Sequence, residues 1–274
     1  MAEAAKQAIE PGLRWFFRIA SVLALIAGIL LFVLATRTDD FFSWTIEPPI
    51  SAAFMGAAYW AACVLLAWAA RQTTWARAGT AVPPVLLIAV LLLAATLIHL
   101  DRFHLGSVFG VFWLTVYIVV SPLLLYLLVR QSRRSAPAPP RGRRLPGSLR
   151  VLLALQAAAM VGLGIALWVS PGGADSLWPW VLTPLTARAI GAFLIGFGAA
   201  AAYAARQDDL DRLHGAALAY ATLGALELLA VAIHSSDLTG TTAQCSIYVA
   251  FCVTVLAAGL YGSMAGRSAP PVSA

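Results

Sequence analysis

The chain has 274 residues, of which 61% are apolar and only 11% are charged, and its formal net charge is +6. Soluble domains carry roughly 25% charged residues, so this composition excludes a water-soluble globular protein. The apolar residues form long runs without a period of two, which excludes a membrane β-barrel. Seven arginines gather in or beside one short segment, as membrane topology requires, so nucleic acid is not an expected partner.

Eight apolar stretches are each long enough to cross about 30 Å of hydrocarbon at about 1.5 Å per residue. They predict membrane-spanning helices at residues 15–36, 50–70, 82–100, 108–130, 150–169, 185–205, 213–234 and 242–264. The fold class is therefore all-α integral membrane. Lys6 is the only lysine among 18 basic residues, and alanine is abundant, which favours a GC-rich bacterial genome. The expected location is the bacterial inner (plasma) membrane.

Residues 131–149 lie between the fourth and fifth spans and read QSRRSAPAPPRGRRLPGSL. Proline, arginine and serine dominate there, which is typical of a flexible linker. Its arginines are expected to face anionic lipid headgroups. The linker divides the chain into residues 1–130 and residues 150–274.

The basic residues predict the orientation of the spans. If the N-terminus lies inside, fifteen lysines and arginines fall in cytoplasmic segments, whereas only Arg37 and Arg102 fall in external ones. This bias is the one that the positive-inside rule describes, so both termini are predicted to be cytoplasmic. Trp44, Trp178 and Trp180 would then lie at the outer boundary, where an aromatic belt is expected.

The two halves of the chain align with each other at an offset of 135 residues. Without a gap, Pro49 aligns with Pro184 and Ile98-His99 aligns with Ile233-His234; Arg71-Gln72 also aligns with Arg206-Gln207. Because each half holds four spans, an even number, both halves enter the membrane from the same side. The sequence therefore predicts two parallel four-helix repeats, related by an axis along the membrane normal.

Glu227 is the most informative single residue. It precedes His234 by seven residues, so it should lie about 10 Å inside the outer boundary. A lone carboxylate at that depth is costly, so it should be protonated or paired, and Arg188, four residues into the sixth span, is the expected partner. The aligned positions of the first half hold Leu92 and Ala53, so only the second half has these charges. The pair could stabilise helix packing, bind a substrate or relay a proton.

His99 and His234 each end an outward-facing span, and each is soon followed by an aspartate. Three roles are open: a structural hydrogen bond, a ligand pair for a metal or haem, and a pH-sensitive gate. The sequence has no C-x-x-C-H motif, so no cofactor is predicted. A zinc site would need His99, His104, His234 and Asp237 to converge.

These features favour a protein that binds or transports a small solute through a polar site in the outer leaflet, between the repeats. Glu227 and Arg188 would form the core of the site, with His99 and His234 at its mouth. Two alternatives belong to other classes: a metal- or haem-dependent membrane enzyme that uses His99 and His234, and a non-catalytic membrane scaffold or accessory subunit.

Overall fold

A computed structural model describes residues 8–135, 142–174 and 177–267. These residues are helical throughout, apart from turns and one isolated bridge between Ala8 and Thr74. Eight helical segments within them are long and apolar enough to cross a membrane, which confirms the predicted number of spans. The segments are Pro11–Val33, Pro49–Arg71, Trp75–Ile98, Val108–Arg134, Gly147–Val169, Pro184–Gln207, Leu210–Ile233 and Thr242–Gly266. The protein is a multi-pass helical membrane protein.

The first span is α2 (Pro11–Gly28), which continues as the π-helical turn η1 (Ile29–Val33). The other long helices are α4 (Pro49–Arg71), α6 (Val82–Ile98), α7 (Val108–Arg134), α8 (Gly147–Val169), α10 (Pro184–Gln207), α11 (Leu210–Ile233) and α12 (Thr242–Arg267). The helices α2, α4 and α10 begin at proline, which lacks only an N–H that the first turn of a helix leaves unpaired.

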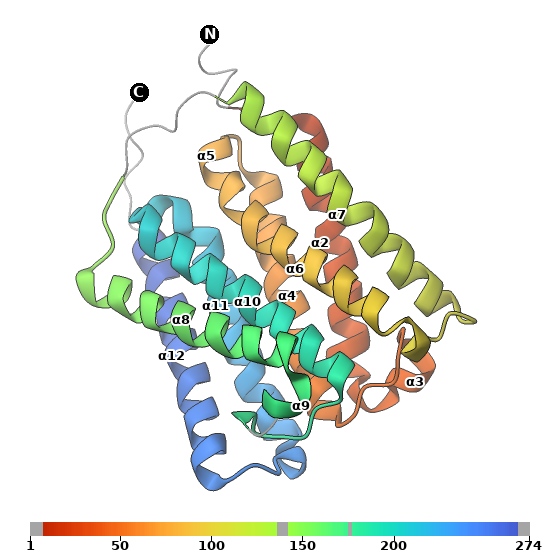
Figure 1. The fold of residues 1–274 in the computed structure, drawn as a ribbon. Helices are drawn as coiled ribbons and strands as arrows, with labels where there is room; N and C mark the ends of the chain where they lie inside the picture. Colours follow the sequence, from red (N-terminus) through yellow and green to blue (C-terminus); the bar gives the residue numbers. More distant parts are fainter. Residues whose placement is uncertain (1–7, 136–141, 175–176, 268–274) are drawn as a thin grey trace.

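Short helical turns mark the two ends of the bundle (Figure 1). One end, called the α9 end here, holds α3 (Thr38–Phe41), α9 (Pro171–Ala174), η4 (Leu100–Arg102) and η6 (Ser235–Asp237). The opposite end, called the α5 end, holds α5 (Trp75–Ala78). Chain segments that are distant in sequence meet at the α9 end, since His104 N donates to Ser43 O and Gly240 N donates to Pro179 O, both at 2.9 Å.

The eight helices form two layers of four (Figure 1). In one layer the order of neighbours is α8, α10, α6, α7, and in the other it is α12, α11, α4, α2. Each layer therefore contains two helices from each half of the chain. The third helix of each half packs against the second helix of the other half, so the halves are interleaved.

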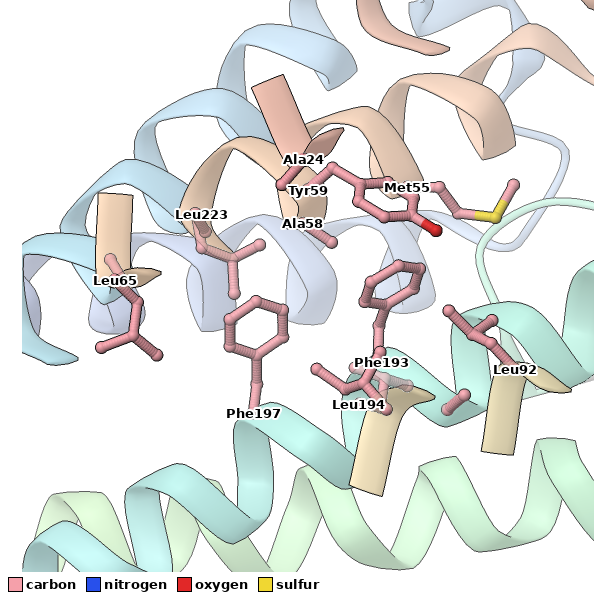
Figure 2. Packing of buried hydrophobic residues seen from close by; sticks show 14 of the residues in the cluster. Ala24, Met55, Ala58, Tyr59, Leu65, Leu92, Phe193, Leu194, Phe197 and Leu223 are labelled. Atoms are coloured by element: carbon pink, nitrogen blue, oxygen red, sulfur yellow. The ribbon is translucent and has the colours of Figure 1, made fainter. Parts of the chain in front are cut away.

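The central helices of the two layers, α4 and α10, form the core. In each of them, 72% of the most apolar 18-residue stretch is buried within the protein. In the other six spans this share is 22–39%, so their outer faces are available to lipid. Figure 2 shows Phe193 and Phe197 of α10 pointing toward Ala58 and Tyr59 of α4. The rings of Tyr59 and Phe193 meet edge to face, with centroids 5.1 Å apart.

Helices extend into both ends of the predicted linker. The helix α7 continues to Arg134 and α8 begins at Gly147, because a helix can extend past the hydrocarbon. Residues 136–141 lie outside the described residues. Beyond them, Gly142 N donates to Asp209 Oδ2 and Leu145 N donates to Asp208 Oδ1, both at 3.0 Å. The turn between α10 and α11 therefore anchors the segment that leads into α8.

Several arginines of this region pair with carboxylates of the protein. Arg130 and Arg134 both lie within ion-pair distance of Glu10, which is largely buried. Arg143 lies 3.2 Å from Asp211. These arginines, which were expected to face lipid headgroups, form ion pairs within the protein instead. Arg133 and Arg144 are exposed.

Candidate functional site

Glu227 lies on α11, six residues before the helix ends, and is 4% exposed. Its Oε2 accepts a hydrogen bond of 2.9 Å from the Tyr248 hydroxyl of α12. Its Oε1 is buried without a hydrogen-bond partner. The carboxyl group therefore faces the protein interior, which avoids the cost of exposing it to lipid.

The predicted ion pair between Glu227 and Arg188 is wrong. Among the described residues, no lysine, arginine or histidine lies within 4.0 Å of the Glu227 carboxyl group. The Arg188 Nη1 atom instead lies 2.6 Å from His99 Nε2 at the end of α6. The reason is the layer order, because Arg188 of α10 lies beside α6 in one layer, whereas Glu227 of α11 faces its own neighbour α12 in the other.

Glu227 lines a cavity of about 350 Å³. Each of the four long helices of the second half contributes to its wall, and α4 contributes Phe54. Most of the lining is apolar. The polar side chains in it are those of Glu227, Gln244, Tyr248, Cys252 and Trp178.

Aromatic residues cover the cavity at the α9 end. The Trp178 ring lies edge to face with Tyr248 at 5.6 Å and with Phe54 at 5.7 Å, and Trp180 lies 5.4 Å from Tyr248. The indole of Trp180 also donates a 2.8 Å hydrogen bond to Ser51 of α4, which fixes the covering segment to the other half of the chain. Trp178 Nε1 is buried without a partner.

These tryptophans differ from the predicted aromatic belt. Trp44, Trp178 and Trp180 are at most 3% exposed, whereas residues of a belt face the lipid interface. Each packs inward against aromatic rings of its own half, as Trp44 does against Phe42 and Trp113 at about 5 Å. Burial of these large rings stabilises the protein more than their placement at the membrane interface would, because aromatic pairs gain both packing and favourable ring geometry.

The cavity reaches the side of the bundle. Two of its lining residues, Leu177 and Ile247, are 63% and 69% exposed, and both are apolar. Ala159 of α8 is a third exposed lining residue. In a membrane this side of the protein faces lipid, so the opening is lateral.

His99 is held next to a permanent cation. Burial lowers the pKa of His99 below its ordinary value of 6.5, and the neighbouring Arg188 guanidinium lowers it further; Asp101 opposes the shift, while Arg102 adds to it. The short contact between Arg188 Nη1 and His99 Nε2 requires a neutral imidazole that accepts the hydrogen bond, since the guanidinium can only donate. The two halves of the chain meet in this contact.

The remaining candidates at the α9 end are separated from one another. His104 Nε2 lies 3.4 Å from the Thr45 hydroxyl. Asp237 Oδ2 accepts from Ile50 N at 3.0 Å and so caps the start of α4. His234 ends α11 and is partly buried. Within the described parts of the chain, no three His, Cys, Asp or Glu side chains gather as a metal site would require, so His99, His104, His234 and Asp237 do not converge.

Sequence reasoning missed Tyr248 as the partner of Glu227. A signal for it existed in the hairpin that α11 and α12 form. Glu227 lies six residues before the end of α11, and Tyr248 lies six residues after the start of α12. Residues equally far from the turn of an antiparallel pair lie at the same depth. The polar residue opposite Glu227 could therefore be found by counting.

Comparisons of the chain with protein-family models, with curated proteins and with solved structures find no match. The class of the protein therefore rests on its eight apolar spans.

Proposed function

We propose that this membrane protein binds a small, mostly apolar solute in the cavity at Glu227, as the recognition step of transport. The observation that carries the proposal is Glu227, a buried carboxyl group with one unpartnered oxygen among the described residues, which lines an apolar cavity of about 350 Å³. Small-molecule sites are typically apolar cavities of this size order with a few well-placed polar groups.

The distribution of basic residues supports a position in the outer leaflet. The α5 end holds Arg71, Arg77, Arg206 and the described part of the arginine-rich linker, and the positive-inside rule assigns such an end to the cytoplasm. Glu227 lies about 9 Å from the opposite end of α11, given the rise of a helix. The solute would thus be bound on the external side of the bilayer centre.

Element boundaries support the proposed duplication. The helices α4 and α10 begin at Pro49 and Pro184, and η4 and η6 begin at Leu100 and Ser235, so each pair differs by 135 residues. At the same offset, α2 aligns with α8, α6 aligns with α11, and α7 aligns with α12. Each helix of one layer therefore aligns with a helix of the other layer. This arrangement fits two repeats that are related by a half-turn about the membrane normal.

The first half has a smaller cavity, of about 130 Å³, at the corresponding place. Ten of its lining residues are Ala24, Tyr59, Ala62, Ile88, Ala89, Phe112, Trp113, Val116, Tyr117 and Val120. Ten lining residues of the larger cavity follow them by 135 positions: Ala159, Leu194, Phe197, Leu223, Gly224, Ile247, Tyr248, Phe251, Cys252 and Val255. We infer that the two cavities derive from one ancestral site.

The two cavities have diverged in size and polarity. Leu92 aligns with Glu227, and the tyrosine hydroxyls of Tyr59 and Tyr117 bond to each other at 2.5 Å in the first half. The first cavity is therefore narrower and lacks the carboxyl group. The solute site is assigned to the second half.

The test is ligand-induced stabilisation of the purified protein. A panel of small apolar solutes with one polar group each would be screened for an increase in Tm in detergent or nanodiscs, since a ligand that binds only the folded state raises its stability. Ala159→Phe places a ring at the lateral opening of the cavity and should abolish the increase. Ala158→Phe is the matched control, because Ala158 is exposed on the same helix but does not line the cavity.

A solute that stabilises wild type and Ala158→Phe but not Ala159→Phe supports the proposal. If no solute stabilises the protein, or if both variants respond like wild type, the solute-binding function is wrong. The scaffold or accessory-subunit role would then be the better description.

A further inference from the structure

We propose that the solute of this cavity is a lipophilic organic cation, such as an aryl- or alkylammonium ion, which enters sideways from the bilayer. This inference rests on the proposed function and specifies its substrate class. Three features of the site carry it: the uncompensated carboxyl group, the aromatic rings around it and the lateral opening.

The carboxyl group of Glu227 has no cationic partner in the part of the chain that the structure describes. No described arginine, lysine or histidine lies within 4.0 Å of it, and the cavity lining contains none of these residues. Charge within hydrocarbon must be paired or neutralised. A cationic solute in the cavity would supply the missing charge partner of the Glu227 carboxyl group, while Tyr248 keeps its hydrogen bond to Oε2.

Aromatic side chains suit the same ligand. Phe54, Trp178, Tyr248 and Phe251 all line the cavity. The faces of aromatic rings attract ammonium groups, most strongly where water is excluded, and tryptophan is the best of them. A carboxylate beside several rings is thus a recognised arrangement for a quaternary or tertiary ammonium group.

The shape of the cavity selects a compact amphipathic molecule. The exposed apolar residues Leu177 and Ile247 lie at the lateral opening of the cavity. The segment that holds Trp178 covers the cavity at the α9 end. A solute that arrives through the lipid would enter without crossing this aromatic cover. The largely apolar wall, with α8 and α10 contributing Met160, Leu194 and Phe197, holds the hydrocarbon part of such a molecule.

A cation and a proton would compete for the same carboxylate. The other titratable groups in the described lining are the Tyr248 hydroxyl and the Cys252 thiol, both from α12, while α4, α8 and α10 present only apolar side chains there. Binding to the protonated site releases that proton to water as the cation takes its place. The affinity for the cation should therefore rise with pH, whereas the affinity for a neutral solute should not.

The experiment compares two probes of one shape. Benzyltrimethylammonium carries a positive charge, and neopentylbenzene replaces its trimethylammonium group with a neutral tert-butyl group. Binding to the full-length protein would be measured in nanodiscs through quenching of tryptophan fluorescence and through the rise in Tm. We expect Glu227→Gln, which keeps a hydrogen-bond acceptor for Tyr248, to weaken binding of the cation at least about tenfold. Binding of the neutral probe should be unchanged or stronger.

Ala159→Phe should abolish binding of both probes and does not touch the carboxyl group, so it tests the cavity even if Glu227→Gln fails to fold. If wild type binds the neutral probe as tightly as the cation, or if affinity for the cation is independent of pH, the cationic substrate class is wrong although the cavity still binds solutes. If neither probe nor any solute of the panel stabilises the protein, the proposed function fails as well.

Discussion

Tyr248 donates a hydrogen bond to Glu227, and it is the one such donor to this carboxyl group among the described residues. Two α-helices of a hairpin carry these residues, and both side chains lie in an apolar environment. A hydrogen bond in such an environment contributes little to net stability, but an unmade one is costly. The pair should therefore behave as a coupled unit.

A double-mutant cycle measures that coupling. Tyr248→Phe removes the hydroxyl that donates to Glu227 and should lower the free energy of unfolding by about 1–3 kcal/mol. In a Glu227→Leu background the same change should have a much smaller effect, because no carboxyl group is left without a donor. The free energies would be obtained from unfolding in detergent titrated with dodecyl sulfate. Tyr261→Phe is the control, since Tyr261 is exposed on the same helix. Additive effects of the two substitutions would contradict the coupling.

The contact between Arg188 and His99 predicts a dependence of stability on pH. Burial and Arg188 lower the pKa of His99, so the folded protein binds fewer protons than the unfolded chain between the folded pKa and about 6.5. The stabilisation is complete above the unfolded pKa and is lost as the pH falls through the folded pKa. Arg188→Gln should raise the pKa of His99, with burial still opposing its protonation.

This titration can be followed by NMR of protein labelled at histidine, with His99→Gln to assign the signal. The Tm of wild type should fall more steeply than that of Arg188→Gln as the pH is lowered from about 7 to about 5. An unchanged His99 pKa in Arg188→Gln would show that the cation does not act on the imidazole.

At the scale of helices, α4 and α10 are central because small residues let their neighbours approach. A Cβ atom added at Gly56 would lie 2.5 Å from Phe32 N, and one added at Gly191 would lie 2.7 Å from Gly164 O. Both contacts are with backbone, which cannot rotate away. Close backbone approach of this kind drives helix association in lipid.

Gly56→Ala and Gly191→Ala should each lower stability by about 1–3 kcal/mol, the usual cost of overpacking. Gly162→Ala is the matched control because an added Cβ would meet nothing within 4 Å on that face of α8. The three variants would be compared by thermal unfolding in the same detergent. Equal Tm values for all three would show that α2–α4 and α8–α10 are not packed as closely as described.

Hydropathy predicts the number of membrane spans correctly, but it does not predict where each helix ends. The predicted fourth span stops at residue 130, whereas α7 continues to Arg134, and α8 starts at Gly147 instead of residue 150. Apolar runs mark the part of a helix within hydrocarbon. The polar turns beyond it follow helix-forming tendency and contacts such as the pairing of Arg134 with Glu10, which a hydropathy window does not detect.

For the whole molecule, the orientation in the membrane is the most direct prediction. A reporter enzyme fused after residue 140 should report a cytoplasmic location for that site. A reporter inserted near residue 174 should report an external location. The excess of arginine at the α5 end is the physical reason, since positive loops are retained inside. An external signal from the fusion at residue 140 would reverse the orientation and place Glu227 in the inner leaflet.

The sequence by itself determined the class of the molecule, the number of spans and the burial of Glu227, because the cost of placing charge or bare backbone in hydrocarbon is a property of local composition. Only the tertiary structure decided which helices are neighbours. Lipid tails are as apolar as the protein interior, so hydropathy does not distinguish a face that meets another helix from a face that meets lipid. For this reason Arg188 was assigned to Glu227 by depth alone, whereas the layer order gives Arg188 to His99 and Glu227 to Tyr248. The cavity at Glu227 likewise exists only where α8, α10, α11 and α12 meet.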